Sequence, residues 1–357
     1  MNKPVSNKKT KKFADFVETE NPQLSLFALL EDDRDDYSHT IELYDFMPKF
    51  VFGKPDRISG KFLETVERGF VCRKLNYRLR MTPARIKDVN GVERDTFPGK
   101  REEMVEDALR KMAADGRNAK AVYLNGQLSV VFSRFALQKE LEEHGHSYDY
   151  RQIEEAIITL FSVSIEVTRE DEDMRVAFHP IEAYGFKDRD GENVTFVKFS
   201  PLVTESIQKN AFRLINYQQL MSYKTTIARH LHKRMSHNFS QAAKDEIYHI
   251  STNTIYRDFG LKKLSNLGLQ VIEVKKALEE LITAKVVLSY EMKEVFDPKR
   301  KNKKIDCVFL IKHHQSFIDE AINSNKDVNV RKFTPQVRGK SFRQEKVRYL
   351  PKKKSEE

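Results

Sequence analysis

Residues 267 to 311 read LGLQVIEVKKALEELITAKVVLSYEMKEVFDPKRKNKKIDCVFLI, and this stretch decides the fold that we expect. From Leu267 to Ala284, apolar residues recur at intervals of four and three, which predicts an amphipathic helix with one buried stripe. Leu267, Val271, Val274, Leu278 and Leu281 make up that stripe. Two β-rich runs follow, Val286 to Val295 and Ile305 to Ile311, and the segment Asp297 to Lys304 between them has the composition of a turn.

This turn carries a concentrated positive charge. Five cations lie in it: Lys299, Arg300, Lys301, Lys303 and Lys304. Their mutual repulsion at a hairpin tip would be relieved by a polyanion, although a run of charge can also be a simple solvated loop. A helix followed by a basic hairpin is the order of a recognition helix and wing, the parts with which small proteins hold DNA.

Positions that lie off the buried stripe are candidates for contact with DNA. Gln270, Glu273 and Lys276 are expected on the free face of the helix. We predict that the wing cations hold phosphates, and that five residues of the helix and the segment before it contact DNA, some of them at base edges. These five are Lys262, Lys263, Asn266, Gln270 and Lys276.

Size and charge indicate a soluble, cytoplasmic chain with an anionic partner. The 357 residues, 39% of them hydrophobic, suffice for about two domains. The excess of Lys and Arg gives a net charge of +10, which favours nucleic acid as the partner. No run of about 20 apolar residues predicts a membrane span. Cys72 and Cys307 are far apart and have no ligand-spaced neighbours, so we expect no disulfide, metal or cofactor.

The predicted fold class is α+β, with two tandem winged-helix domains between flexible tails. The limits are 1–43 for the N-terminal tail, 44–205 for the first winged helix, 206–320 for the second, and 321–357 for a basic C-terminal arm. In the first domain we predict helices at Arg101–Ala114, Arg134–Glu143 (capped by Ser133) and after Asp149, and strands at Leu128–Phe132, Ser162–Thr168 and Arg175–Phe178. In the second domain, helices are predicted at Tyr217–Tyr223, Thr225–Asn238 and Thr252–Phe259.

Paired winged helices with basic arms resemble the plasmid replication initiators that bind repeated origin sequences called iterons. The closest likeness lies around Ala228, Arg229, Leu231 and Arg234, followed by Ile255, Tyr256 and Phe259. The resemblance implies that the second winged helix reads DNA, while the first contacts the backbone and forms a dimer surface. It also implies origin opening, contact with the host helicase and host initiator, a monomer–dimer equilibrium and repression of the protein's own promoter. Glu170 to Asp173, at the predicted first wing, depart from this pattern because phosphates would repel them.

A second resemblance lies in the N-terminal tail. Gln23, Leu24, Ser25, Leu26 and Phe27 look like the pentapeptide by which bacterial proteins dock on the replicative sliding clamp. An extended segment of this kind places its apolar side chains in a groove while the Gln amide bonds the rim. The alternative is a short amphipathic element that caps the first domain.

No catalytic constellation is predicted, and we expect the protein not to be an enzyme. His230 and His232 imitate the His-hydrophobic-His motif of rolling-circle nickases. In a helix, however, the side chains of residues i and i+2 point about 200° away from each other. One of them is expected to be packed and the other exposed. Gly53, Gly60 and Lys61 lack the spacing of a phosphate loop. A winged-helix transcriptional repressor without a role in initiation is the main alternative to an initiator.

Overall fold

The computed structural model describes residues 43–53, 57–58, 62–72, 74–87, 91–115, 119–124, 127–171, 174–189, 192–201, 203–204, 217–238 and 247–322. Within these residues, no helix has the length and apolar character needed to cross a membrane. Residues 1–42 and 323–357, which make up nearly all of the two predicted tails and include the clamp-like pentapeptide Gln23–Phe27, fall outside the described residues. The α+β fold class is confirmed, since helices and antiparallel sheets alternate along the chain.

The second unit, whose hydrophobic core runs from Tyr223 to Ile318, has the element order of a winged helix. Helix α9 (Thr226–Asn238) leads to strand β13 (Ile247–Ser251), and then come α10 (Thr252–Asp258) and α11 (Leu267–Thr283). Strands β14 (Val287–Asp297) and β15 (Arg300–His313) close the unit, and the sheet order is β13-β15-β14. Gly260 follows α10 with a φ of 65° that an L side chain rarely adopts, and so ends the helix.

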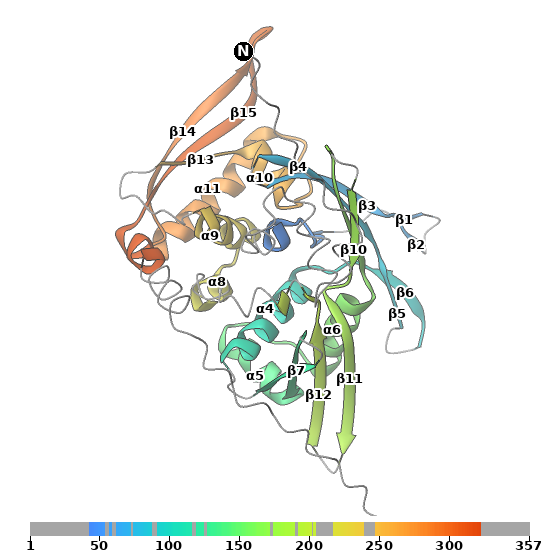
Figure 1. The fold of residues 1–357 in the computed structure, drawn as a ribbon. Helices are drawn as coiled ribbons and strands as arrows, with labels where there is room; N and C mark the ends of the chain where they lie inside the picture. Colours follow the sequence, from blue (N-terminus) through green and yellow to red (C-terminus); the bar gives the residue numbers. More distant parts are fainter. Residues whose placement is uncertain are drawn as a thin grey trace, which may run out of the picture.

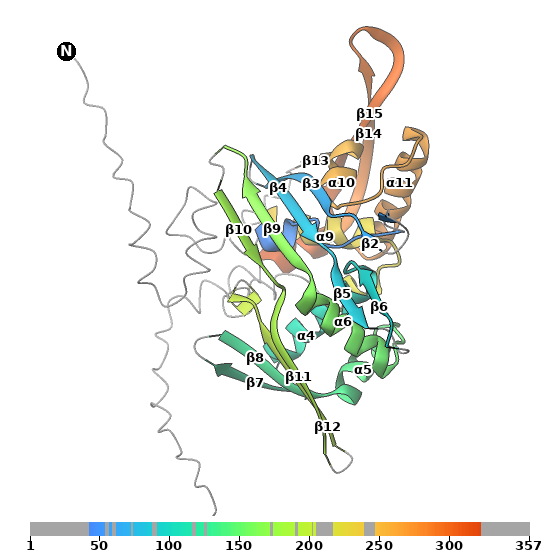
Figure 2. The same cartoon turned by 90° about the vertical axis from the view of Figure 1, so that its right-hand side faces the viewer.

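The wing is longer than the sequence pattern indicated. Strands β14 and β15 pair as far as Asp297 and Arg300, so most of the predicted loop belongs to a hairpin. In Figures 1 and 2 this hairpin projects well beyond the helices of the unit. The pairing shifts register between Val295 and Asp297, and such irregularities bend and twist a strand. The cations at its tip are therefore carried away from the body of the protein.

Two helices of the first unit begin where their caps were predicted. Helix α4 spans Lys100–Asp115, α5 spans Arg134–Glu143 and α6 spans Tyr150–Ser162. Ser133 accepts a hydrogen bond from Ala136 N at 3.1 Å. Asp149 accepts one from Gln152 N at 2.8 Å, and the Gln152 side chain accepts the return bond from Asp149 N, which completes a capping box.

The strands of the first unit form a more elaborate arrangement than in the second. The predicted wing, β9 (Ser164–Arg169) with β10 (Met174–Phe178), pairs with two earlier strands, β4 (Leu75–Thr82) and β3 (Val66–Cys72), in the order β10-β9-β4-β3. Strand β8 (Gln127–Ser133) lies instead in the sheet β11-β12-β8-β7, with β7 (Ala119–Leu124), β11 (Ile181–Arg189) and β12 (Glu192–Phe199). Two further strand pairs are described in this unit: β1 (Arg57–Ile58) with β2 (Phe62–Leu63), and β5 (Ala84–Lys87) with β6 (Glu93–Thr96).

Two hydrophobic cores divide the described residues. The first runs from Leu43 to Met221 and the second from Tyr223 to Ile318. Tyr217 and Met221, in helix α8 (Tyr217–Ser222), pack with the first core, although the predicted second domain starts at residue 206. The short helix therefore belongs to the packing of the first unit and leads directly into α9.

Buried ion pairs join the two units. On α9, Arg229 pairs with Asp107 and lies 3.1 Å from Glu103, and Lys233 contacts both acids at 2.9 and 3.0 Å. All four side chains are at most 10% exposed. Burial alone raises the pKa of Glu103, but Lys233 and Arg229 outweigh it and hold this pKa well below its ordinary value. Both acids are therefore ionised, and the contact between α4 and α9 is electrostatic.

His232 lies on α9 inside the second core and makes stability depend on pH. Its ring stands 2.9 Å from the Tyr223 hydroxyl, and burial, assisted by Arg229, lowers its pKa to about 3 from 6.5. Below about pH 6.5 the His232 imidazole is protonated in the unfolded chain but stays neutral in the folded chain. The free energy of unfolding therefore decreases as the pH falls. From pH 7 to pH 5 we expect a loss of about 2 kcal/mol from this residue.

Urea unfolding at the two pH values, on the protein and on His232→Gln, measures this contribution. The variant cannot titrate there and should lose about 2 kcal/mol less over the same interval. Other titrating groups are common to both proteins and cancel in the comparison. An equal loss in both proteins would show that His232 is not the group responsible.

Candidate nucleic-acid interface

Helix α11 supplies the central surface of the candidate site. Asn266 caps its start, accepting a 2.7 Å hydrogen bond from Gly268 N. Val274, Ala277, Leu278 and Leu281 are buried on its inner face. Three of them, Val274, Leu278 and Leu281, belong to the predicted apolar stripe. On the outer face, Lys276 is exposed, and so are Leu269 and Ile272. The helix thus stands with one side against its own core and the other in solvent.

The expectation that Gln270 lies on the free face is wrong. Its side chain is 2% exposed, and Nε2 donates a 2.7 Å hydrogen bond to the carbonyl of Leu264. The apolar stripe identifies the centre of the buried face but not its width, and Gln270 sits at the edge where the preceding loop folds back. It therefore holds that loop on the helix and cannot reach a base edge in this arrangement.

Gln270→Ala should consequently change stability and leave sequence preference intact. Removing the bond leaves the Leu264 carbonyl without this partner, and we expect a loss of about 1–2 kcal/mol. Unfolding in urea gives the loss, and competition between a preferred and a scrambled duplex gives the discrimination. If the variant has normal stability but no longer distinguishes the two duplexes, Gln270 contacts a base edge after all.

The remaining predicted helix-side contacts lie at or before the start of α11. Lys262 and Lys263 are exposed in the loop between α10 and α11. Asn266 is exposed, and its capping bond uses only the side-chain oxygen, so the amide nitrogen takes no part in it. Lys276 lies farther along the helix, on its outer face. Contact of each with DNA remains a prediction.

The wing presents its cations to solvent. Lys299, Arg300, Lys303 and Lys304 are exposed, and Lys301 lies in β15. Lys304 forms a 2.5 Å ion pair with Glu294 on the facing strand. The sequence pattern missed Lys293, which is exposed on β14 and which alternation along the strand would have identified. The wing therefore offers a row of positive charge beside α11.

Between helix and wing lies an open groove of about 600 Å³. Residues Ser265, Asn266, Leu267, Gly268, Val271, Met292, Glu294, Lys304 and Cys307 line it. The start of α11 forms one wall and the facing strands form the other. A nucleic-acid strand following this groove would meet backbone amides at the helix start and the ammonium group of Lys304.

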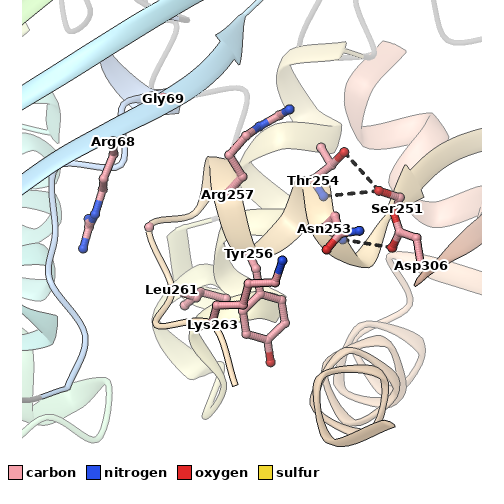
Figure 3. A pocket seen from close by; sticks show the side chains of 11 residues that line it. Arg68, Gly69, Ser251, Asn253, Thr254, Tyr256, Arg257, Leu261, Lys263 and Asp306 are labelled. Carbon is pink, nitrogen blue, oxygen red and sulfur yellow. Dashed lines mark hydrogen bonds between the residues drawn. The ribbon is translucent and has the colours of Figure 1, made fainter. Parts of the chain in front are cut away.

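A second groove, of about 680 Å³, opens where the two units meet (Figure 3). Arg68 lies on the β3 side, while Thr254 and Arg257 belong to α10 and Lys263 to the loop that follows. Arg68 donates to the carbonyls of Pro48 and Phe50 at 2.6 and 2.7 Å, so it fixes the junction and burial lowers its pKa to about 10. The exposed cations of the groove are Arg257 and Lys263.

The described acids of the first wing, Glu170 and Asp171, pair with arginines of their own sheet. Glu170 pairs with Arg78 at 3.2 Å, and Asp171 pairs with Arg169 at 2.7 Å. Arg80 on the same strand as Arg78 pairs with Glu67 at 3.7 Å. These three arginines are therefore engaged by acids.

The two histidines of the nickase-like motif lie on different sides of α9. His230 approaches Glu103 at 3.4 Å and the rings of Phe52 and Phe259, whereas His232 contacts Tyr223 and the ring of Phe317. The prediction that the helix separates them is confirmed. The prediction that one of them is exposed is wrong, because His230 lies at the junction of the two units, where its side chain is only 10% exposed. No group of three metal-ligating side chains occurs in the part of the chain that the structure describes.

No family model matches the chain, and no curated protein matches it. Among solved structures, domains 2 and 3 of RctB share 10% identity over 77% of this chain and 98% of that one, with a TM-score of 0.48. A second structure of RctB domains 2-3 gives 10% identity, coverage of 79% and 99%, and a TM-score of 0.47. The Pi initiator protein in complex with iteron DNA gives 14% identity, coverage of 59% and 94%, and a TM-score of 0.38. At these identities the likeness lies in the course of the backbone and not in the side chains.

Proposed function

We propose that this chain is a plasmid replication initiator that binds repeated double-stranded sites at an origin. In this role it opens nearby DNA, brings in the host helicase and host initiator, and represses its own promoter as a dimer. Binding and distortion of a duplex require no bond to be made or broken by the protein. We therefore propose a non-enzymatic protein.

The observation that carries the proposal is the projecting β14–β15 hairpin beside α11. Its exposed cations lie beyond the body of the protein, where a helix entering the major groove would bring them against the flanking phosphates. Phosphate contacts give affinity and register, whereas the outer face of α11 is the surface available to base edges. An origin-binding function also agrees with the resemblance of the sequence to iteron-binding initiators.

Footprinting on the DNA that flanks the coding sequence tests this proposal. Full-length protein should protect direct repeats there, and a plasmid carrying that segment should replicate only when the protein is supplied. A variant with Lys299, Arg300 and Lys303 changed to Ala should lose both properties. Protection of a single operator without support of replication would identify a transcriptional repressor instead.

The clamp-like pentapeptide separates initiation from DNA binding. Leu26→Ala with Phe27→Ala removes two apolar anchors of the proposed docking segment. We expect unchanged binding to origin DNA, as measured by fluorescence anisotropy, and a plasmid-maintenance frequency at least tenfold lower. Gln127→Ala, far from both surfaces in sequence, is a control. Normal maintenance in the double variant would show that the segment does not serve clamp docking.

The nickase alternative has a direct assay. Supercoiled origin DNA is incubated with the protein and Mg²⁺ or Mn²⁺, and the products are examined for nicked circles and for a covalent Tyr adduct. The non-enzymatic proposal expects neither product. An adduct would overturn it.

A further inference from the structure

The outer face of α11 has an apolar centre. Leu269 is 51% exposed and Ile272 is 63% exposed. An α-helix turns by about 100° per residue about its axis. Leu269, Ile272 and Lys276 therefore fall within an arc of about 60° on the side opposite the buried residues. Ile272 lies near the middle of that side, directly away from the core. The residue that points most directly away from the core is therefore aliphatic.

The surroundings of this apolar centre fit a duplex better than a protein partner. Exposed cations lie in the loop before α11, at Lys262 and Lys263, and on its outer face, at Lys276, and the basic hairpin stands beside the helix in Figure 1. A large interface with a protein would have to desolvate these ammonium groups, whereas phosphates on both sides of a groove would neutralise them. The charge arrangement thus points to the major groove, which is wide enough for one helix.

Base edges in the major groove offer one apolar group, the C5-methyl of thymine. An aliphatic side chain pressed against any other edge would bury a donor or acceptor without a partner, which is unfavourable. Gln270 cannot supply an amide reader from this helix because it is buried against Leu264. The exposed acids of this helix are engaged by tyrosines: Glu273 accepts a 2.5 Å hydrogen bond from the Tyr256 hydroxyl, and Glu279 accepts one of 3.2 Å from the Tyr290 hydroxyl.

We propose that Ile272 and Leu269 determine sequence specificity by contacting thymine methyl groups in the major groove. The inference rests on the proposed DNA-binding function and assigns the chemistry by which that same surface reads its site. The site should contain at least one A·T pair, with its thymine methyl turned toward Ile272. Lys276 and the wing then provide attraction that does not depend on that methyl.

The test uses a duplex selected by the full-length protein from a randomised 30-base-pair pool. Each thymine of the selected duplex is replaced singly by deoxyuracil, which removes the methyl and keeps every hydrogen-bonding group. We expect one or two positions at which affinity falls about fourfold, the loss for one buried methyl or methylene group. In Ile272→Ala or Leu269→Ala, the matching position should become insensitive to uracil.

Control variants separate this inference from the function on which it rests. Lys276→Ala should weaken thymine and uracil duplexes by the same factor. If no duplex is selected, the proposed function fails. If a duplex is selected but uracil has no effect, or if its effect persists in both aliphatic variants, the methyl contact is wrong. A lower molecular mass of Ile272→Ala in light scattering would show that this face packs on a second copy, which also overturns it.

Discussion

Arg229→Ala should lower the free energy of unfolding by about 3–5 kcal/mol, the usual cost of leaving a buried charge without its partner. Arg229 is 1% exposed and stands between Asp107 and Glu103, and it also donates a 2.8 Å hydrogen bond to the Leu220 carbonyl. Its removal leaves two buried carboxylates that share Lys233. Those carboxylates must then stay ionised at high cost or take up a proton.

Urea unfolding at pH 7.5 measures this effect, and a surface pair supplies the matched control. Arg80 and Glu67 are more than half exposed, so Arg80→Ala should cost at most about 1 kcal/mol. A double-mutant cycle with Asp107→Ala should show coupling, because the second change removes a buried carboxylate that the first deprived of Arg229. Equal, small losses for Arg229→Ala and Arg80→Ala would mean that water reaches the junction and that the ion pairs there are not buried.

Local rules were enough to locate most elements of this fold. Ser133 and Asp149 mark helix starts because a short polar side chain there accepts a backbone N–H that no preceding turn can satisfy. The apolar spacing of α11 and the charge of the wing also follow from a short stretch of chain. Each of these features depends on residues close together in sequence, and so a single sequence reveals it.

Features that depend on distant residues could not be predicted in this way. Strand β8 pairs with β12 and not with the wing strand β9, a choice set by packing across the whole unit. The charges of α9 look like those of a solvated helix, yet α4 supplies Glu103 and Asp107 opposite Arg229 and Lys233. In the candidate site, the same limit applies to Gln270, whose partner is a loop carbonyl that folds back onto the helix.

Raising the salt concentration from 50 to 200 mM should weaken DNA binding by about 10³ to 10⁵, if some 6 to 10 phosphates are neutralised. In the part of the chain that the structure describes, exposed cations of the wing and the α11 region include Lys262, Lys263, Lys276, Lys293, Lys299, Arg300, Lys303 and Lys304. Each cation that meets a phosphate displaces a condensed counterion, so the slope of log K against log salt reports how many are used. The buried ion pairs at Arg229 are shielded from this screening, and the loss therefore reflects DNA binding rather than unfolding.

Single substitutions of the cations should show how much each contributes to the slope of log K against log salt. Lys299→Ala and Lys303→Ala should each reduce it by about one and weaken binding to all duplexes alike. Lys304 already pairs with Glu294 at 2.5 Å, so Lys304→Ala should change the slope less, because the ion pair must open before a phosphate is bound. Ile272→Ala should leave the slope unchanged, since it carries no charge to exchange for a counterion. Fluorescence anisotropy at four salt concentrations measures all of these, and a slope near zero in the unaltered protein would mean that the projecting hairpin does not grip the phosphate backbone.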